Sequence, residues 1–475
     1  MAGIVLSALV TVLAGHLLFR NRLLDINNEP FGVKLPLYYM GGSVIISLYM
    51  YLLFLIKVNY SFISISLPFI AYGLYLLLSR RDRSPSISTK AQRYLSGLVD
   101  EARKKENRLF IIILSVLSLT ALVVFLENLF MPIYIGDAYI HWYFKAKAIF
   151  IARTIPMDIL TDNTLYYSAL DYPLLTSLNI AWISICLGRW SDSLTKIFFS
   201  LQYISAAFFM FQVLKSRAKF SSVDALIATF ITFTIPHLIG DITTGYVDVS
   251  VGLFGFFACI MLWQHLSSGN NTPALPISAI FAGAAAWTKN DGIAIFLALF
   301  GTLLLFSLLR AMSDKKYLPT AIKDGCSFLA ISLFIFLPFK MLIFSLGIEN
   351  HMILSAGQLT SLLTGLWRVP IIIRFFIYEF FLDSYHWLYL WIFWVVLLFI
   401  ERKKLLSSSA KYPFTFVCLC IILYFCVYMV TALGMTPATL VNNLELSLDR
   451  VILGFAPSAS FVLFLAVLGK NKAKL

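Results

Sequence analysis

The strongest constraint on this chain is a series of apolar runs, each about twenty residues long. A helix of that length crosses the hydrocarbon core of a bilayer and satisfies its own backbone hydrogen bonds. Of the 475 residues, 60% are hydrophobic and only 13% are charged, which leaves too few charges to cover a water-soluble surface. The sequence therefore predicts an all-α, polytopic membrane protein.

About 13 of these runs are expected to be transmembrane helices. An odd number places the two termini on opposite sides of the membrane. The first run is followed, not preceded, by its first basic residue, Arg20, which is the reverse of a secretory signal peptide. We therefore expect a retained first span with the amino terminus outside. The predicted spans are 1–19, 35–57, 59–79, 109–127, 193–214, 222–236, 249–266, 274–288, 292–310, 325–346, 386–400, 413–433 and 452–469.

The segment 173–188 decides the predicted orientation. It is apolar but short, and it carries several hydroxyl and amide side chains. Counting it as a span would turn the later basic clusters outward, whereas placing it along the outer interface keeps them all inside. In that arrangement 26 of the 37 Lys and Arg residues lie in cytoplasmic segments, at 20–34, 80–108, 215–219, 310–323, 402–411 and 470–474.

This charge sorting predicts the organisation of the chain. Residues 1–79 form three N-terminal transmembrane helices, and 80–108 form a basic cytoplasmic loop beside anionic headgroups. A core follows at 109–469, with an outer loop at 128–192 and a cytoplasmic tail at 470–475. The net charge of +13 thus reflects cytoplasmic retention in a plasma (inner) membrane rather than nucleic-acid binding. The six cysteines lack metal-ligand spacing, and no metal ligands are predicted.

The outer loop gathers carboxylates in an otherwise apolar chain. On a helix over 137–153, Asp137, His141 and Lys145 would share one stripe at i, i+4 and i+8. Such a stripe could engage a sugar attached to a lipid phosphate, with the cation at the phosphate and the carboxylate at a hydroxyl. The same spacing also fits an ordinary interfacial helix with solvated charges.

Other charged residues fall at the outer ends of predicted spans. Lys289 and Asp291 lie between two spans with almost no loop, and Asp449 precedes Arg450 at the start of the last span. Charges at helix ends can also reach water without any function. Spacing alone does not say which of these residues meet in space. Further candidates on the outer side are Asp162, Asp171, His237, Asp241 and Asp248.

Taken in order, these motifs resemble the C-type (GT-C) polytopic membrane glycosyltransferases, which include aminoarabinose transferase and protein O-mannosyltransferase types. The resemblance covers roughly residues 109–469. Many members follow the first Asp of the loop with a second acid, whereas this chain has Ala138, so Asp171 or Asp162 is expected in that role. The motifs are Gly136-Asp137-Ala138, Trp142, Lys145-Ala146-Lys147, Asp171-Tyr172-Pro173-Leu174-Leu175, Thr288-Lys289-Asn290-Asp291-Gly292 and Asp449-Arg450.

The resemblance implies a glycosyltransferase that uses a polyprenyl-phosphate-linked sugar donor on the extracytoplasmic face. It places the catalytic carboxylate at Asp137 and juxtamembrane helices at 138–153 and 173–188. The acceptor could be a lipid, a glycan or a protein, and no cofactor is required, although a divalent cation is possible. Donor-phosphate binding is expected at Lys289, Arg450 and Lys145, and a second acid or acceptor contact at Asp171, Asp162, His141, Asp248 or Asp291.

Two other functions remain open from the sequence. A membrane transporter or lipid-linked glycan flippase would need charged or broken segments at membrane depth. A glycan ligase or polymerase would also work on the outer face, but it would release a lipid diphosphate. Identification of the released lipid distinguishes a transferase from a ligase or polymerase, and transport without covalent transfer distinguishes a transporter from both.

Overall fold

The computed structural model describes residues 1–20, 24–79, 92, 96–97, 108–268, 273–348, 365–431, 434 and 436–469. Within these ranges every regular element is a helix, which confirms the predicted all-α class. Most of the predicted basic loop 80–108 and the predicted tail 470–475 lie outside the described residues.

The chain divides into two compact units, which are described separately. Unit 1 holds Met1–Asp162, Leu174–Thr234 and Ile242–Tyr246, and unit 2 holds Asn163–Pro173, Ile235–Asp241 and Val247–Leu475. The three N-terminal helices therefore belong to the same unit as the first helices of the predicted core.

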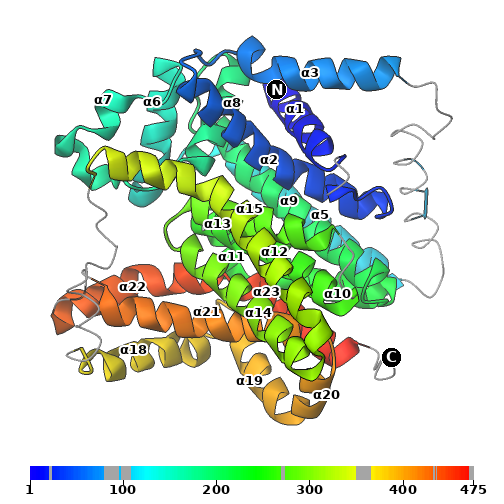
Figure 1. Cartoon of the computed structure of the whole chain (residues 1–475). Helices are drawn as coiled ribbons and strands as arrows, with labels where there is room; N and C mark the ends of the chain where they lie inside the picture. The colour runs from blue at the N-terminus through cyan, green and yellow to red at the C-terminus, as the bar shows by residue number, and fades with distance from the viewer. Residues whose placement is uncertain are drawn as a thin grey trace. The chain divides into compact units, whose positions relative to one another are not determined.

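Unit 1 contains a layer of long apolar helices and the short helices of the predicted outer loop. Within it, α1 packs along α2, and α8 lies against both (Figure 1). Its helices are α1 (Ala2–Leu18), α2 (Phe31–Leu55), α3 (Phe62–Leu78), α5 (Arg108–Phe130), the π-helix η3 (Ala138–Tyr143), α6 (Phe144–Ala152), α7 (Met157–Leu160), α8 (Leu175–Leu187), η5 (Leu194–Lys196), α9 (Ile197–Ser216) and α10 (Ser222–Phe233).

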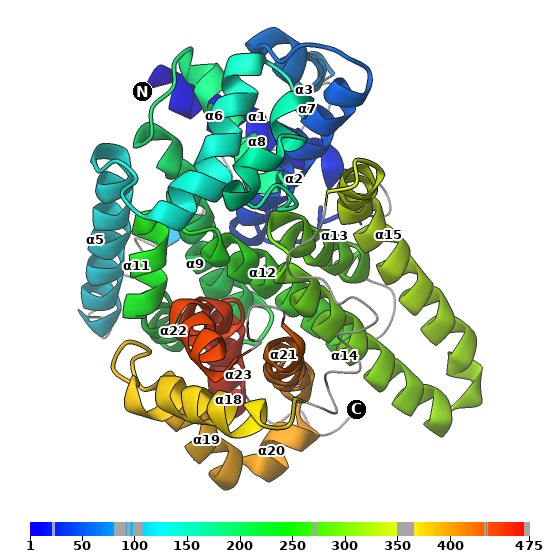
Figure 2. The ribbon, with the colours of Figure 1, turned by 90° about the vertical axis from the view of Figure 1, so that its left-hand side faces the viewer.

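Unit 2 is built around α12 and α13, which are buried along almost their whole length. Figure 2 shows α21 and α22 end-on, with α18 beside α22. The helices are η4 (Asn163–Ser168), most of α11 (Pro236–Thr244), α12 (Asp248–Ser268), α13 (Ala274–Thr288), α14 (Gly292–Ser313), η6 (Lys315–Tyr317), α15 (Leu318–Ser345), α18 (Arg368–Ile377), the π-helix η7 (Tyr378–Leu382), α19 (Leu390–Ile400), α20 (Arg402–Ser407), α21 (Lys411–Val430), α22 (Pro437–Leu453) and α23 (Ala456–Leu468).

Seven helices among the described residues are long and apolar enough to cross a membrane, or up to nine if two bent pairs each count as one span. The pairs are α10 with α11 and α22 with α23, the second bent by 46°. Five further apolar helices have 10–17 residues. The chain therefore has the architecture of a multi-pass helical membrane protein, and the part of it that the structure describes contains fewer full-length spans than the about 13 predicted.

The exposed side chains of α5 support this class. Its sequence is apolar on all sides, and Ile112 and Leu119 are each 60% exposed. A helix that is apolar all round and not covered by protein is stable in lipid but not in water. The surface of α5 is therefore suited to contact with acyl chains.

Glycines allow α1 and α2 to approach closely. A Cβ atom on Gly42 would lie 1.8 Å from the carbonyl oxygen of Thr11, and one on Gly15 would lie 1.8 Å from that of Tyr38. Membrane helices associate through such small-residue contacts because burial against lipid gives them little hydrophobic driving force. In unit 2, Gly252 plays the same part, since its Cβ would lie 2.8 Å from the carbonyl oxygen of Leu453.

We predict that Gly42→Ala destabilises unit 1 by about 1–3 kcal/mol, because the new methyl group meets rigid backbone rather than a movable side chain. The measurement is thermal unfolding of the purified protein in detergent, followed by tryptophan fluorescence. Gly73→Ala is the matched control, because its nearest neighbour is the Cδ1 atom of Leu13 at 3.3 Å. An equal loss in both variants would contradict the close-approach explanation.

Candidate functional site

The centre of unit 2 is a buried lysine in the short connection between α13 and α14. Helix α13 ends at Thr288, and Lys289 follows in an extended conformation. Its side chain is 6% exposed, and its Nζ lies 2.7 Å from Asp248 Oδ1 and 2.7 Å from Asp291 Oδ2. One ammonium thus joins the start of α12 to the residue before α14.

The two carboxylates keep Lys289 charged. Burial by itself lowers the pKa of this ammonium, but the nearby Asp248 and Asp291 outweigh burial and raise the pKa above its ordinary value. Two of its three N–H donors are used by these carboxylates. Lys289 therefore has one donor left for a further acceptor.

The next residue, Asn290, extends the polar group to two more elements. Its Nδ2 donates to Asp171 Oδ2 at 2.8 Å, and its Oδ1 accepts from Lys340 Nζ. Asp171 is 1% exposed, and Lys340 comes from α15. Residues 289–291 therefore connect the 163–173 segment, α12 and α15 through side chains alone. We refer to Asp171, Asp248, Lys289, Asn290, Asp291 and Lys340 as the Lys289 cluster.

Gly292 makes the tight turn after this cluster possible. A Cβ atom there would lie 1.9 Å from the carbonyl oxygen of Ala285, so any other residue would push α14 away from α13. Tyr424 of α21 donates from its hydroxyl to the backbone oxygen of Asp291 at 3.1 Å. The sequence motif 288–292 thus positions a cation, an amide and a carboxylate with little freedom.

Arg450 and two more acids lie near the Lys289 cluster. The guanidinium of Arg450 is close enough to interact electrostatically with Asp241 and Asp248. It also donates to the carbonyl oxygen of Leu446 at 2.5 Å, and its side chain is half-buried. Asp241 is 8% exposed. Unit 2 therefore brings five of the predicted site residues close enough together to interact electrostatically. They are Asp171, Asp248, Lys289, Asp291 and Arg450.

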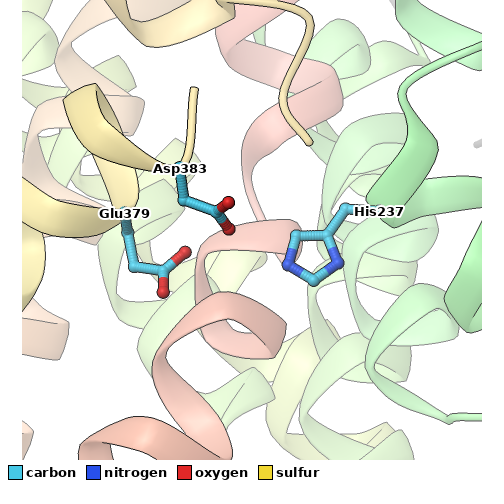
Figure 3. Close-up of side chains that lie close together, drawn as sticks. All are labelled: His237, Glu379 and Asp383. Atoms are coloured by element: carbon cyan, nitrogen blue, oxygen red, sulfur yellow. The ribbon is translucent and has the colours of Figure 1, made fainter. Parts of the chain in front are cut away.

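A second group in unit 2 combines imidazoles with carboxylates. Ligand atoms of His237, Glu379 and Asp383 all lie within 4.8 Å of one another (Figure 3). His237 comes from α11, Glu379 is the second residue of η7, and Asp383 follows the last residue of η7. Asp449 Oδ2 lies 3.4 Å from His237 Nε2, and His386 Nδ1 lies 2.5 Å from Asp383 Oδ1. These donor types are those that hold a divalent metal ion.

Glu379 lies among other acids. Burial, reinforced by the charges of Asp449 and Asp383, raises its pKa to about 7. A carboxyl with such a pKa can exchange a proton near neutral pH. The carboxylates of Asp248 and Asp291 thus lie beside a cation, whereas the carboxyl group of Glu379 lies beside other acids.

In unit 1 the structure corrects the predicted helix 137–153. Residues 138–143 form a π-helix and only 144–152 an α-helix, so Asp137, His141 and Lys145 do not share a regular i, i+4, i+8 stripe. Asp137 is half-buried at the start of η3, whereas Lys145 is only 2% exposed. Lys145 therefore faces the interior rather than the headgroup zone. π-Helical turns are rare and are frequent at functional sites.

The predicted interfacial segment 173–188 forms α8, a helix of 13 residues. Every side chain from Leu175 to Ile185 is buried. Ser177 donates to the carbonyl oxygen of Trp142 at 3.0 Å, which ties α8 to η3. Because an interfacial helix would expose a polar face, α8 is better described as part of the interior of unit 1. Asp162, another predicted site residue, is exposed.

Sequence reasoning missed several of the residues that complete these groups. Asn290 was noted only as part of the motif 288–292, and Lys340 and Glu379 only as charges of ambiguous depth. None of these three was predicted as a site residue, and neither were Asp383 and His386. For Glu379, Asp383 and His386 a signal existed, because positions i, i+4 and i+7 fall on one helical face. For Lys340 no local signal existed, since its partner Asn290 is 50 residues away in the chain.

Comparison with known proteins gives no relative from which a function could be carried over: no family model matches the chain, and neither do curated proteins or solved structures.

We predict that Lys289→Met destabilises unit 2 by about 3–5 kcal/mol, because it leaves the buried carboxylate of Asp248 and the half-buried carboxylate of Asp291 without their cation. The double variant Lys289→Met, Asp248→Asn is expected to recover part of this loss, since it removes one of those charges. Thermal unfolding in detergent measures both, with the exposed Lys147→Met as control. Equal unfolding temperatures of Lys289→Met and wild type would show that these ion pairs do not stabilise unit 2.

Proposed function

We propose that this chain is a membrane glycosyltransferase that moves a sugar from a polyprenyl-phosphate-linked donor to a lipid, glycan or protein acceptor. The observation that carries the proposal is the Lys289 cluster, in which charged side chains are buried in an apolar helical bundle next to Arg450. Ionisable residues are expensive in such bundles and by default indicate a functional site. The resemblance of the surrounding motifs to GT-C enzymes gives the chemistry.

The reaction needs a base and a site for phosphate. The acceptor hydroxyl attacks the sugar carbon that bears the phosphate, the bond from that carbon to the phosphate oxygen breaks, and the lipid phosphate leaves as an anion. A base takes the proton of the acceptor, and cations stabilise the charge that grows on the phosphate. In this proposal Asp137 is the base.

Arg450 and Lys289 are the proposed phosphate contacts. Arg450 is proposed because its planar guanidinium carries five N–H donors in the geometry that suits phosphate oxygens, and it lies near Asp241 and Asp248 beside Lys289. Lys289 contributes through its remaining N–H donor and through its positive charge, since its other two donors are paired with Asp248 and Asp291. Lys145 stays a third candidate, and Asp171, Asp162, His141, Asp248 and Asp291 stay candidates for the second acid or for acceptor contacts.

The proposed topology keeps thirteen spans. The seven long helices and the two bent pairs supply nine, and four of the shorter apolar helices, α1, α3, α13 and α19, supply the rest. The amino terminus then lies outside, the carboxyl terminus lies in the cytoplasm, and the site faces the extracytoplasmic side of the plasma (inner) membrane.

We predict that Asp137→Asn lowers sugar transfer by at least about 100-fold, because the amide cannot accept the acceptor's proton. The assay uses purified protein in nanodiscs, a panel of polyprenyl-phosphate sugars with labelled sugar, and membrane extract as the source of acceptors. The measured quantity is label transferred per unit time, together with the identity of the released lipid.

Asp158→Asn is the matched control, because this exposed acid lies in the same loop. It is expected to keep wild-type activity, and both variants are expected to unfold at the wild-type temperature. Full activity of Asp137→Asn would remove Asp137 as the base. Release of a lipid diphosphate in place of a monophosphate would favour a ligase or polymerase.

One feature favours a transporter as the second candidate. Helices α22 and α23 form a bent pair, and Asp449 and Arg450 lie four and three residues before the end of α22. Broken helices with charged residues near the break are typical of secondary transporters. Uptake of a labelled lipid-linked sugar into proteoliposomes without covalent transfer would support this function and overturn the transferase.

A further inference from the structure

The group around His237 has no part in the proposed sugar transfer. It combines one residue of α11 with Glu379, near the start of η7, and Asp383, directly after the end of η7. The backbone N–H of His237 donates to the carbonyl oxygen of His386 at 3.3 Å, and the imidazole packs on Trp387 with ring centroids 4.7 Å apart. Backbone and aromatic contacts thus hold the imidazole facing the two carboxylates (Figure 3).

The spacing of the donor atoms is close to that of a bound metal. The nitrogen or oxygen donors around a tetrahedral zinc ion lie about 2.0–2.1 Å from it and hence about 3.3 Å apart. Here one donor atom from each of the three residues lies within 4.8 Å of the others, so small side-chain rotations would bring them to bonding distance. Asp449 Oδ2, 3.4 Å from His237 Nε2, is placed to be a fourth donor.

Two carboxylate oxygens in the group point to a cation. Asp449 Oδ1 is buried without a hydrogen-bond partner, and Glu379 Oε2 is buried with no hydrogen bond of normal geometry, although the Trp387 side chain lies near enough to interact with this carboxyl group. A buried carboxylate oxygen without a donor is costly, and three acids side by side repel one another. A divalent cation would pair with these buried oxygens and would also reduce the repulsion among the acids. His386, at 2.5 Å from Asp383, resembles the outer contacts that orient ligating carboxylates in metal sites.

We propose that His237, Glu379 and Asp383, completed by Asp449, bind one divalent transition-metal ion of the Zn²⁺ or Mn²⁺ type. The imidazole distinguishes such a site from one for Ca²⁺ or Mg²⁺, which prefer oxygen ligands only. The bound ion would join α11, η7 and α22 of unit 2. This site does not depend on the proposed transferase activity.

The test uses the full-length protein in detergent, freed of any affinity tag and treated with a chelator. Zinc chloride is then added, and bound zinc per chain and the thermal unfolding temperature are measured. Wild type is expected to bind one zinc ion and to unfold at a higher temperature with zinc, because the ion binds only the folded state. Manganese chloride is tested in the same way.

Glu379→Gln and His237→Gln are expected to bind zinc at least about tenfold more weakly, the loss that even outer-shell changes cause in metal sites. Glu379→Gln removes a crowded charge and keeps the shape, so it should fold without metal as well as wild type does. Loss of the zinc-induced thermal shift in this well-folded variant separates a metal site from a merely structural role.

The matched control is His265→Gln, which alters a buried His–Asp pair between α12 and α15, with Nε2 of His265 3.2 Å from Asp324 Oδ2. This variant is expected to bind zinc as wild type does. Cobalt substitution distinguishes imidazole and carboxylate ligands from the six cysteines, because thiolates give strong near-ultraviolet charge-transfer absorption. Absence of metal binding in wild type, unchanged binding in Glu379→Gln, or a thiolate absorption band would each overturn the proposal.

Discussion

The arrangement of unit 2 depends on the buried ion pairs of Lys289. An ammonium in an apolar bundle is stable only if its charge is balanced at short range, because the cost of desolvation is several kcal/mol for each ion. Asp248 and Asp291 provide that balance at 2.7 Å each. The consequence is geometric: the start of α12 and the start of α14 are fixed relative to one point, and Asn290 then fixes Asp171 and Lys340.

Small residues make this arrangement possible. In lipid, helices gain little by hiding apolar surface from one another, so they pack where backbones can touch. Gly292 next to Ala285, Gly252 next to Leu453 and the Gly15 and Gly42 contacts of α1 and α2 are all of this kind. The glycine contacts therefore support the charged cluster, because short interhelical distances bring long polar side chains within reach of their partners.

Carboxyl groups have different surroundings in two parts of unit 2. Asp248 and Asp291 each lie 2.7 Å from the ammonium of Lys289, whereas Glu379 is surrounded by Asp383 and Asp449 and has a pKa raised to about 7 by burial and those charges. Environment, not residue identity, thus separates a group that holds charge from one that exchanges protons or accepts a metal ion. This contrast is the basis for assigning the two groups different roles.

The sequence by itself determined the all-helical membrane architecture and the positions of most helices, because an apolar run of twenty residues has few alternatives in lipid. It also singled out Lys289, Asp291 and Arg450. Only tertiary structure decided that Asp171, 119 residues before Asn290, joins the same cluster, and that His237 meets Glu379 and Asp383. Such contacts follow from helix packing at distances that no local pattern encodes, which is also why the π-helical turn after Asp137 and the burial of Lys145 went unforeseen.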